Sequence, residues 1–168
     1  MKPIQSILAA TDFSATAGRA EERAALLAAQ HEARLTLLYC LSGVDLERLR
    51  DRLLHGLART EAQLLAYYEG LLRRQAEALA ERWRIEVTPL LTVGQPHREI
   101  TRAATDRGAD LIVLGAMGEH PAREFFLGST ADRVIREAAV PVQAITGVSF
   151  AIFFIAISMF NDKGDATL

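Results

Sequence analysis

Residues 109–118 read Ala-Asp-Leu-Ile-Val-Leu-Gly-Ala-Met-Gly, and they are the most informative part of this chain about its architecture. Four consecutive apolar residues, 111–114, lie between Asp110 and Gly115, which is the pattern of a short strand buried on both faces. Such strands belong to parallel sheets, because crossover helices then cover both faces. The stretch therefore predicts a buried strand of an α/β domain with a glycine at its carboxyl end.

Apolar runs and helical segments alternate on both sides of this strand. Four more runs are predicted to be strands: residues 6–10, 35–40, 85–91 and 140–145. Helical sequence is expected between them, at about 15–30, 45–83, 98–107 and 129–138. Pro89 places the third strand at a sheet edge, since proline cannot donate to a neighbouring strand. This β-α order predicts a doubly wound, Rossmann-like, five-stranded parallel sheet with helices on both faces.

Length and composition narrow the class of protein. The 168 residues suit one domain, and the formal charge of -2 gives no electrostatic reason to expect nucleic acid or anionic lipid as a partner. Cys40 is the only cysteine, which rules out an intramolecular disulfide and favours a reducing compartment. The first residues lead into a strand without the pattern of a signal segment, so a cytoplasmic location is expected.

The candidate binding site is a glycine loop. Gly115 and Gly118 follow the buried strand, and nine residues later Gly128-Ser129-Thr130 opens a helix. Glycines let backbone N–H groups turn toward a phosphate without a Cβ in the way. The helix beginning at Ser129 adds unsatisfied N–H groups and the positive end of its dipole. The alternative, a glycine turn followed by an ordinary serine cap, is less favoured because strand, loop and helix come in the order that a phosphate site needs.

Asp12 is the second candidate. It follows the first strand, and doubly wound sheets bind ligands outside the carboxyl ends of their strands, where the strand order reverses. Asp12 and Gly115 are therefore expected on opposite sides of one site. An aspartate at a strand-to-helix turn is also an ordinary helix cap, and this alternative stays open.

The spacing Gly-x2-Gly-x9-Gly-Ser/Thr resembles the nucleotide-binding motif of the ATP-binding branch of the universal stress protein family. Four further segments resemble the family in the right order, namely residues 11–14, 94–100, 109–115 and 140–142. The resemblance covers about residues 1–146. It implies a nucleotide-binding α-hydrolase-like sheet that forms homodimers through its last strand.

The resemblance also implies roles for nine residues: Ala10, Asp12, Cys40, Leu114, Gly115, Gly118, Gly128, Ser129 and Thr130. Asp12 would contact the adenosine end, Ala10 and Cys40 would line the adenine pocket with their backbones, and Leu114 and Gly115 would lie near the ribose. The last four would cradle the phosphates. Their backbone groups would serve ATP, ADP and AMP alike, and the two hydroxyls could reach a water on Mg²⁺.

The sequence favours binding over catalysis. It has no Walker lysine, no Gly-x-Ser-x-Gly elbow and no cysteine/histidine metal spacing. The leading hypothesis is an ATP-binding stress-response or signalling module that acts through conformation or dimerisation. The alternatives are a slow nucleotide hydrolase that uses the same pocket and a partner-binding module whose site is vacant.

The last 22 residues, 147–168, depart from this pattern. Residues 148–160 are almost continuously apolar, and a polar stretch follows. Three alternatives are open: a membrane anchor, an extra strand or helix packed on the body or on a partner subunit, and a foreign sequence. The anchor is least favoured, because the apolar run left after the last strand falls short of the roughly 20 residues needed to span a bilayer.

Overall fold

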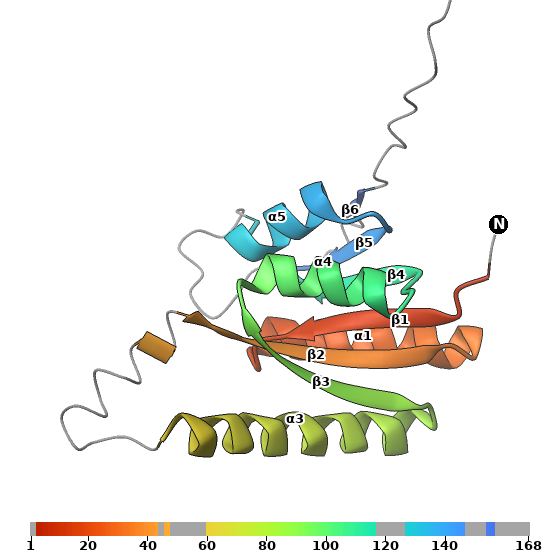
Figure 1. The fold of residues 1–168 in the computed structure, drawn as a ribbon. Coiled ribbons are helices and arrows are strands. Elements are labelled where there is room, and N and C mark those ends of the chain that lie inside the picture. Colours follow the sequence, from red (N-terminus) through yellow and green to blue (C-terminus); the bar gives the residue numbers. More distant parts are fainter. Residues whose placement is uncertain (1–2, 44–45, 48–59, 117–126, 147–153, 157–168) are drawn as a thin grey trace, which may run out of the picture.

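The structure, a computed structural model, describes residues 3–43, 46–47, 60–116, 127–146 and 154–156. These residues form one mixed sheet in the order β3-β2-β1-β4-β5-β6, with helices against its faces (Figure 1). The strands are β1 Ser6–Thr11, β2 Arg34–Ser42, β3 Val87–Gly94, β4 Leu111–Gly115, β5 Val142–Ile145 and β6 Phe154–Ala156. The helices are α1 Ala15–His31, α3 Glu61–Trp83, α4 Pro96–Asp106 and α5 Ser129–Glu137.

The first five strands are parallel, as the β-α alternation predicts. Ile7 pairs with both Leu35 of β2 and Leu111 of β4, so β1 lies at the centre of the sheet. Along the chain, β2 and β3 are added on one side of β1, and β4 and β5 on the other. The strand order therefore reverses between β1 and β4.

Each face of the sheet has its own apolar core. One core joins β1 and β2 to α1 and α3, with Ile7, Leu37 and Leu72 almost fully buried. The other joins β1 and β4 to α4 and α5, with Leu8 and Val134 at its centre. In Figure 1, α1 lies behind the sheet and α4 in front of it. Side chains alternate between the two cores because successive residues of a strand point to opposite faces.

The helices begin where local capping residues allow. The Ser14 side chain accepts a hydrogen bond from the N–H of Ala17 at 3.1 Å, which caps α1 as the Thr-Asp-Phe-Ser pattern predicts. Thr60 and Gln63 form a reciprocal capping box at the start of α3. Both α1 and α3 end on a left-handed residue, Glu32 and Arg84, whose N–H closes the last turn.

Two boundaries differ from the prediction. The helix expected from about residue 45 has its N-cap at Thr60, so α3 begins only at Glu61. The third strand is shifted toward the carboxyl end, to Val87–Gly94, because its backbone pairs with β2 as far as Ser42. Gly70 lies inside α3, whose packing against β3 and α1 outweighs the roughly 1 kcal/mol that a glycine costs relative to alanine. Pro89 does lie on an edge strand, as predicted.

A sixth strand was not part of the five-stranded prediction. Residues 154–156 form β6, which pairs antiparallel with β5 from Ala144↔Phe154 to Val142↔Ala156. This pairing agrees with the extra-strand alternative for the tail, and the remaining residues after 146 lie outside the described part of the chain. Among the described residues, none of the helices has the length and apolar character needed to cross a membrane.

Candidate functional site

The reversal of strand order creates a crevice at the carboxyl ends of β1 and β4. These strands are neighbours, with Ala10 paired to Leu114, yet the chain leaves them in opposite directions along the sheet. The helices that follow therefore cover opposite faces and leave the strand ends uncovered between them.

A cavity of about 320 Å³ occupies this crevice. Its volume lies at the lower end of the range for small-molecule sites, roughly 300–1,000 Å³. Its base is apolar, made by side chains of the α4/α5 core such as Leu38, Ile100 and Leu114. Its other end is formed by Gly128, Ser129 and the residues that follow them at the start of α5. The cavity thus has an apolar part and a part rich in backbone and hydroxyl donors.

The first turn of α5 brings backbone and hydroxyl donors to the cavity. Gly128 is the N-cap residue and makes no side-chain capping bond, so the first-turn N–H groups are not satisfied by a cap. The hydroxyls of Ser129 and Thr130 lie in the same turn and line the cavity. Among the described residues that line the cavity, Asp12 is the only one with an ionisable carboxylate or a basic group. Because no lysine, arginine or histidine is among them, the charge of a bound anion would be stabilised by these donors and by the helix dipole.

Eight of the nine residues predicted for the site line this one cavity, and they come from four separate segments: Ala10 and Asp12; Cys40; Leu114 and Gly115; Gly128, Ser129 and Thr130. The ninth, Gly118, lies outside the described residues. Their contact with a nucleotide remains a prediction, but the fold brings together what the sequence keeps up to 120 positions apart.

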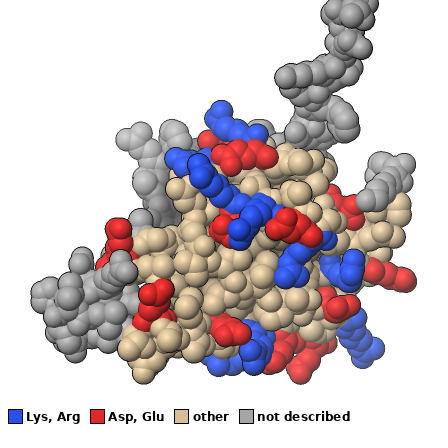
Figure 2. All heavy atoms as spheres, viewed as in Figure 1, with Lys and Arg blue, Asp and Glu red and all other residues tan. Residues whose placement is uncertain are grey.

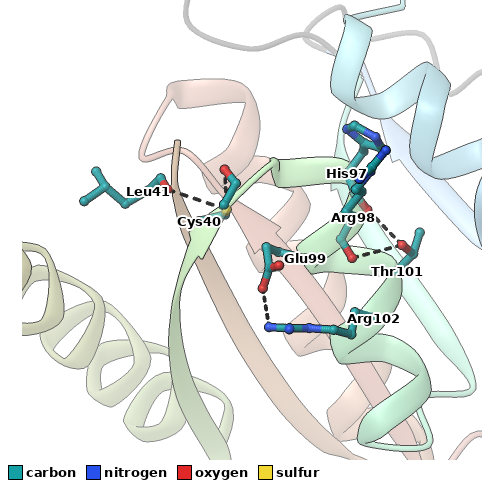
Figure 3. A network of polar contacts seen from close by, with 8 residues as sticks. Cys40, Leu41, His97, Arg98, Glu99, Thr101 and Arg102 are labelled. Atoms are coloured by element: carbon teal, nitrogen blue, oxygen red, sulfur yellow. Dashed lines mark hydrogen bonds and ion pairs between the residues drawn. The ribbon is translucent and has the colours of Figure 1, made fainter. Parts of the chain in front are cut away.

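One wall is formed by the turn of β3 into α4. The Cys40 Sγ lies 3.6 Å from the carbonyl oxygen of Gly94 and 4.0 Å from that of Leu41 (Figure 3). Gly94 has φ 155°, and a Cβ there would lie 3.1 Å from the side chain of Glu99, so this position requires glycine. Glu99 is held in place by Arg102 at 2.5 Å (Figure 3). Cys40 is therefore packed into the wall that also carries Pro96.

The turn that follows β1 contributes Thr11 and Asp12 to the cavity wall, beside the end of β2 that carries Cys40. The N–H of Phe13 donates to Thr11 Oγ1 at 3.0 Å, and the N–H of Ser14 donates to Asp12 Oδ1 at 3.0 Å. Phe13 has φ 62°, a left-handed conformation that is uncommon for a bulky side chain. The alternative interpretation of Asp12 as the helix cap is wrong, because the N-cap of α1 is Ser14. The Asp12 carboxylate instead accepts a hydrogen bond within the turn that precedes the helix, and it also lines the cavity.

Glu21 lies directly behind this turn and was not identified from the sequence. Its side chain in α1 is 2 % exposed and accepts hydrogen bonds from the Thr11 hydroxyl and the Gln75 side-chain amide. Burial raises the pKa of the Glu21 carboxyl above its ordinary value, and the two hydrogen bonds partly oppose this rise. Its Oε1 has no hydrogen-bond partner among the described residues.

The raised pKa of Glu21 predicts a pH-dependent stability. Because the folded carboxyl holds its proton at higher pH than the unfolded one, its contribution is complete below the unfolded pKa and is lost as pH rises through the folded pKa. Glu21→Gln cannot titrate, so the free energy of unfolding of the variant minus that of wild type should increase from pH 4 toward neutrality and then level off. Urea unfolding of both proteins across this range measures the difference. A difference that is flat with pH would contradict the prediction.

Thr11, the partner of Glu21, lines the cavity but was not among the nine predicted site residues. Six other lining residues were not predicted either, because they are small or apolar and carry no chemical signal of their own: Ala17, Leu38, Pro96, Ile100, Ala116 and Ala131. Glu21 did carry a signal. It lies one helical turn after Ala17 and before Ala24, so it is a lone carboxylate on the buried face of an alanine-rich helix.

Residues 3–145 match the family model described as the universal stress protein family. The chain is 35% identical over 138 residues to a universal stress protein of Thermus aquaticus, which covers 82% of this chain and 96% of the relative. It is 27% identical over 153 residues to universal stress protein MJ0577 of Methanocaldococcus jannaschii, with 84% and 94% covered. Among solved structures, the universal stress protein UspA of Lactobacillus plantarum superposes with a TM-score of 0.69 at 26% identity, over 86% of this chain and 99% of that one.

Two structural neighbours hold nucleotides. A universal stress protein in complex with cAMP has a TM-score of 0.64 at 23% identity, over 86% of this chain and 98% of its own. A universal stress protein of Archaeoglobus fulgidus in complex with dAMP has a TM-score of 0.59 at 23% identity, over 86% and 99%. At these identities the likeness to this chain is one of fold.

Proposed function

Because the chain belongs to the universal stress protein family, we propose that it binds an adenine nucleotide, ATP in the first place, in the cavity at the carboxyl ends of β1 and β4. The observation that supports this proposal best is the convergence of four sequence segments on one cavity whose polar end is a helix N-terminus without a side-chain cap. Family members in complex with cAMP and dAMP support an adenine ligand.

The two parts of the cavity suggest how the nucleotide lies. The apolar part, around Leu38 and Leu114, suits the flat face of an adenine ring. The start of α5, with the hydroxyls of Ser129 and Thr130, suits the phosphates. A ligand that spans both parts places its ribose beside Gly115 and Asp12. Mg²⁺, if it accompanies the triphosphate, would be reached by the two hydroxyls through water.

We propose binding and response rather than rapid hydrolysis. An efficient ATPase needs a positioned water and positive charge near the transferred phosphate. Asp12 is the only carboxylate among the described lining residues, and no lysine or arginine is among them. The module would then act in the cytoplasm through nucleotide-dependent changes of conformation or association. If the module binds ATP without rapid hydrolysis, bound ATP should release phosphate over hours rather than seconds.

Homodimerisation through the last parallel strand, which the family resemblance implies, remains part of the proposal. In this chain β6 pairs with the outer edge of β5 over Val142, Gln143 and Ala144. A partner strand would need the same backbone groups. Dimerisation through β5 therefore requires β6 to leave this edge, whereas a monomer keeps the edge covered by a short strand, a common way to prevent edge pairing.

The nucleotide proposal predicts a large thermal shift. At an ATP concentration of 100 times the Kd, binding should stabilise the native state by about 2.7 kcal/mol. For a domain of this size that corresponds to a rise in Tm of roughly 5–10 °C. Differential scanning fluorimetry with ATP, ADP, AMP, GTP and tripolyphosphate, with and without Mg²⁺, measures it, and mass spectrometry of the purified protein identifies any ligand already bound. No shift with any adenine nucleotide, in protein shown to be free of ligand, would leave the vacant partner-binding module as the better hypothesis.

A further inference from the structure

We propose that Glu21 is a positioning residue for the nucleotide site: it holds the turn of residues 11–14 in its strained conformation and ties that turn to helix α3. This inference rests on the proposed function, since it explains how the wall that carries Asp12 is kept in place. Four features of the described residues carry it: the position of the turn between the two cores, the backbone strain at Phe13, the hydrogen bonds of the buried Glu21 carboxyl, and an aromatic contact with α3.

The turn passes between the two cores of the domain. Ala10 and Asp12 line the cavity, on the side of α4 and α5. Thr11 also lines the cavity, and its hydroxyl bonds Glu21 of α1, while Phe13 packs on the core formed by α1 and α3. One short segment therefore contacts both the ligand site and the core on the opposite face of the sheet. A displacement on either side must move the same backbone.

Phe13 shows that this backbone is held under strain. Its φ of 62° is a conformation that an L-residue with a bulky side chain adopts only where its surroundings enforce it. Two groups do so. The Phe13 N–H is fixed by Thr11 Oγ1 at 3.0 Å, and its ring packs against Tyr39 and Tyr68 with centroid separations of 4.7 and 6.1 Å. Tyr68 belongs to α3, so the helix itself contributes to the strained conformation.

Glu21 fixes the acceptor on which this geometry depends. The Thr11 oxygen accepts from the Phe13 N–H at 3.0 Å, and the Thr11 hydroxyl bonds the Glu21 carboxyl, which fixes the orientation of the Thr11 side chain. The same carboxylate accepts from Gln75 of α3. A buried chain of hydrogen bonds thus runs from Gln75 through Glu21 and Thr11 to the N–H of Phe13. Gln75 and Phe13, at the ends of this chain, are half-buried, whereas Glu21 and Thr11 at its centre are buried, so the loss of either central residue leaves a buried polar neighbour unsatisfied.

A role limited to joining α1 to α3 does not account for this arrangement. Glu22, the next residue, already joins the two helices, since it accepts from Trp83 Nε1 at 2.9 Å and from Arg82. It does so on the exposed side of α1 and away from the turn, whereas Glu21 is directed at Thr11. Glu22 is therefore a matched control: the same residue type, in the same helix, with partners in the same second helix.

The test compares Glu21→Leu, Glu21→Gln and Glu22→Gln with wild type by calorimetric titration of ATP. Leucine keeps the buried volume but removes both hydrogen bonds, and it should weaken ATP binding about 5-fold. Glutamine keeps the shape and can still bond Thr11 and Gln75, so it should restore affinity to within about 2-fold of wild type. Glu22→Gln should leave affinity unchanged. Gln75→Leu, which removes the partner in α3, should act in the same direction as Glu21→Leu.

Hydrogen exchange supplies a readout that does not need a ligand. In Glu21→Leu the peptide that contains residues 11–14 should exchange faster than in wild type, and in Glu22→Gln it should not. Wild-type affinity together with wild-type exchange in folded Glu21→Leu would overturn the inference. So would an equal loss in Glu22→Gln, or a Glu21→Gln variant as weak as Glu21→Leu. If wild-type protein bound no nucleotide, the proposed function would fail, while the exchange rates would still decide whether Glu21 positions the turn.

Discussion

Replacement of Gly128 by aspartate is expected to weaken ATP binding about 100-fold, or about 2.7 kcal/mol, while leaving the fold intact. Gly128 is the N-cap of α5, with φ -62° and ψ 150°, a conformation that any residue adopts. Aspartate is among the best N-cap residues, and its carboxylate would accept from the first-turn N–H groups. It would therefore satisfy the donors proposed for the phosphates and place a negative charge where they bind.

Gly128→Asn is the matched control, because asparagine caps a helix as well as aspartate but carries no charge. We expect both variants to unfold at the same temperature as wild type or slightly above it, and Asn to lose less affinity than Asp. Calorimetric titration with ATP and AMP at low and moderate ionic strength measures the effect. Equal affinity of Gly128→Asp and wild type would show that the phosphates do not bind at the start of α5.

Gly128→Asp should weaken ATP binding without lowering the stability of the fold, so a loss of binding cannot be attributed to unfolding. Most variants that reduce binding also loosen the fold, and the two causes are then hard to separate. At Gly128 the helix lacks a side-chain cap. A capping side chain would stabilise the helix but would occupy the N–H groups that a ligand needs. Proteins often keep a less stable residue at such a position because function requires it.

The sequence predicted the parallel part of this fold well, because parallel strands buried on both faces are short uncharged runs between capping residues. Residues 111–114 are the clearest case, and Ser14 caps α1 as its sequence predicts. Predictions failed where pairing or packing outweighed local preference. The last residues of β3 extend along β2. The short strand β6 depends on an edge of β5 that local sequence does not reveal.

The site divides in the same way. Glycines, hydroxyls and an aspartate at strand ends carry a chemical signal. With the family resemblance, this signal predicted nine site residues, and eight of them line one cavity. Alanines and leucines in the wall, such as Ala17 and Leu38, carry none, because any small or apolar residue of a core has the same pattern. Glu21 is the instructive omission. Its helical register places a carboxylate among buried alanines, and such a group must have partners nearby.

Asp12 is not the cap of α1, yet it accepts a hydrogen bond within its own turn and also lines the cavity, so a role in the turn and a role in ligand binding must be separated. A capping role and a ligand role predict different results for Asp12→Ala. If Asp12 only caps the turn, the variant should lose about 1 kcal/mol of stability and bind all ligands somewhat less well. If it also contacts the adenosine end, the loss should depend on whether the ligand contains adenosine.

We expect the second result. Asp12→Ala should weaken ATP binding about 30-fold, in the range of a lost hydrogen bond to a charged group, and should leave tripolyphosphate binding within about 2-fold. Tripolyphosphate binding should tighten if it changes, because Asp12 carries the same sign of charge as the phosphates and its removal reduces repulsion. Asp12→Asn keeps an acceptor for the Ser14 N–H and should fall between alanine and wild type. Titrations of the three proteins with ATP, adenosine and tripolyphosphate separate the roles, and an equal loss for all ligands would assign Asp12 to the turn alone.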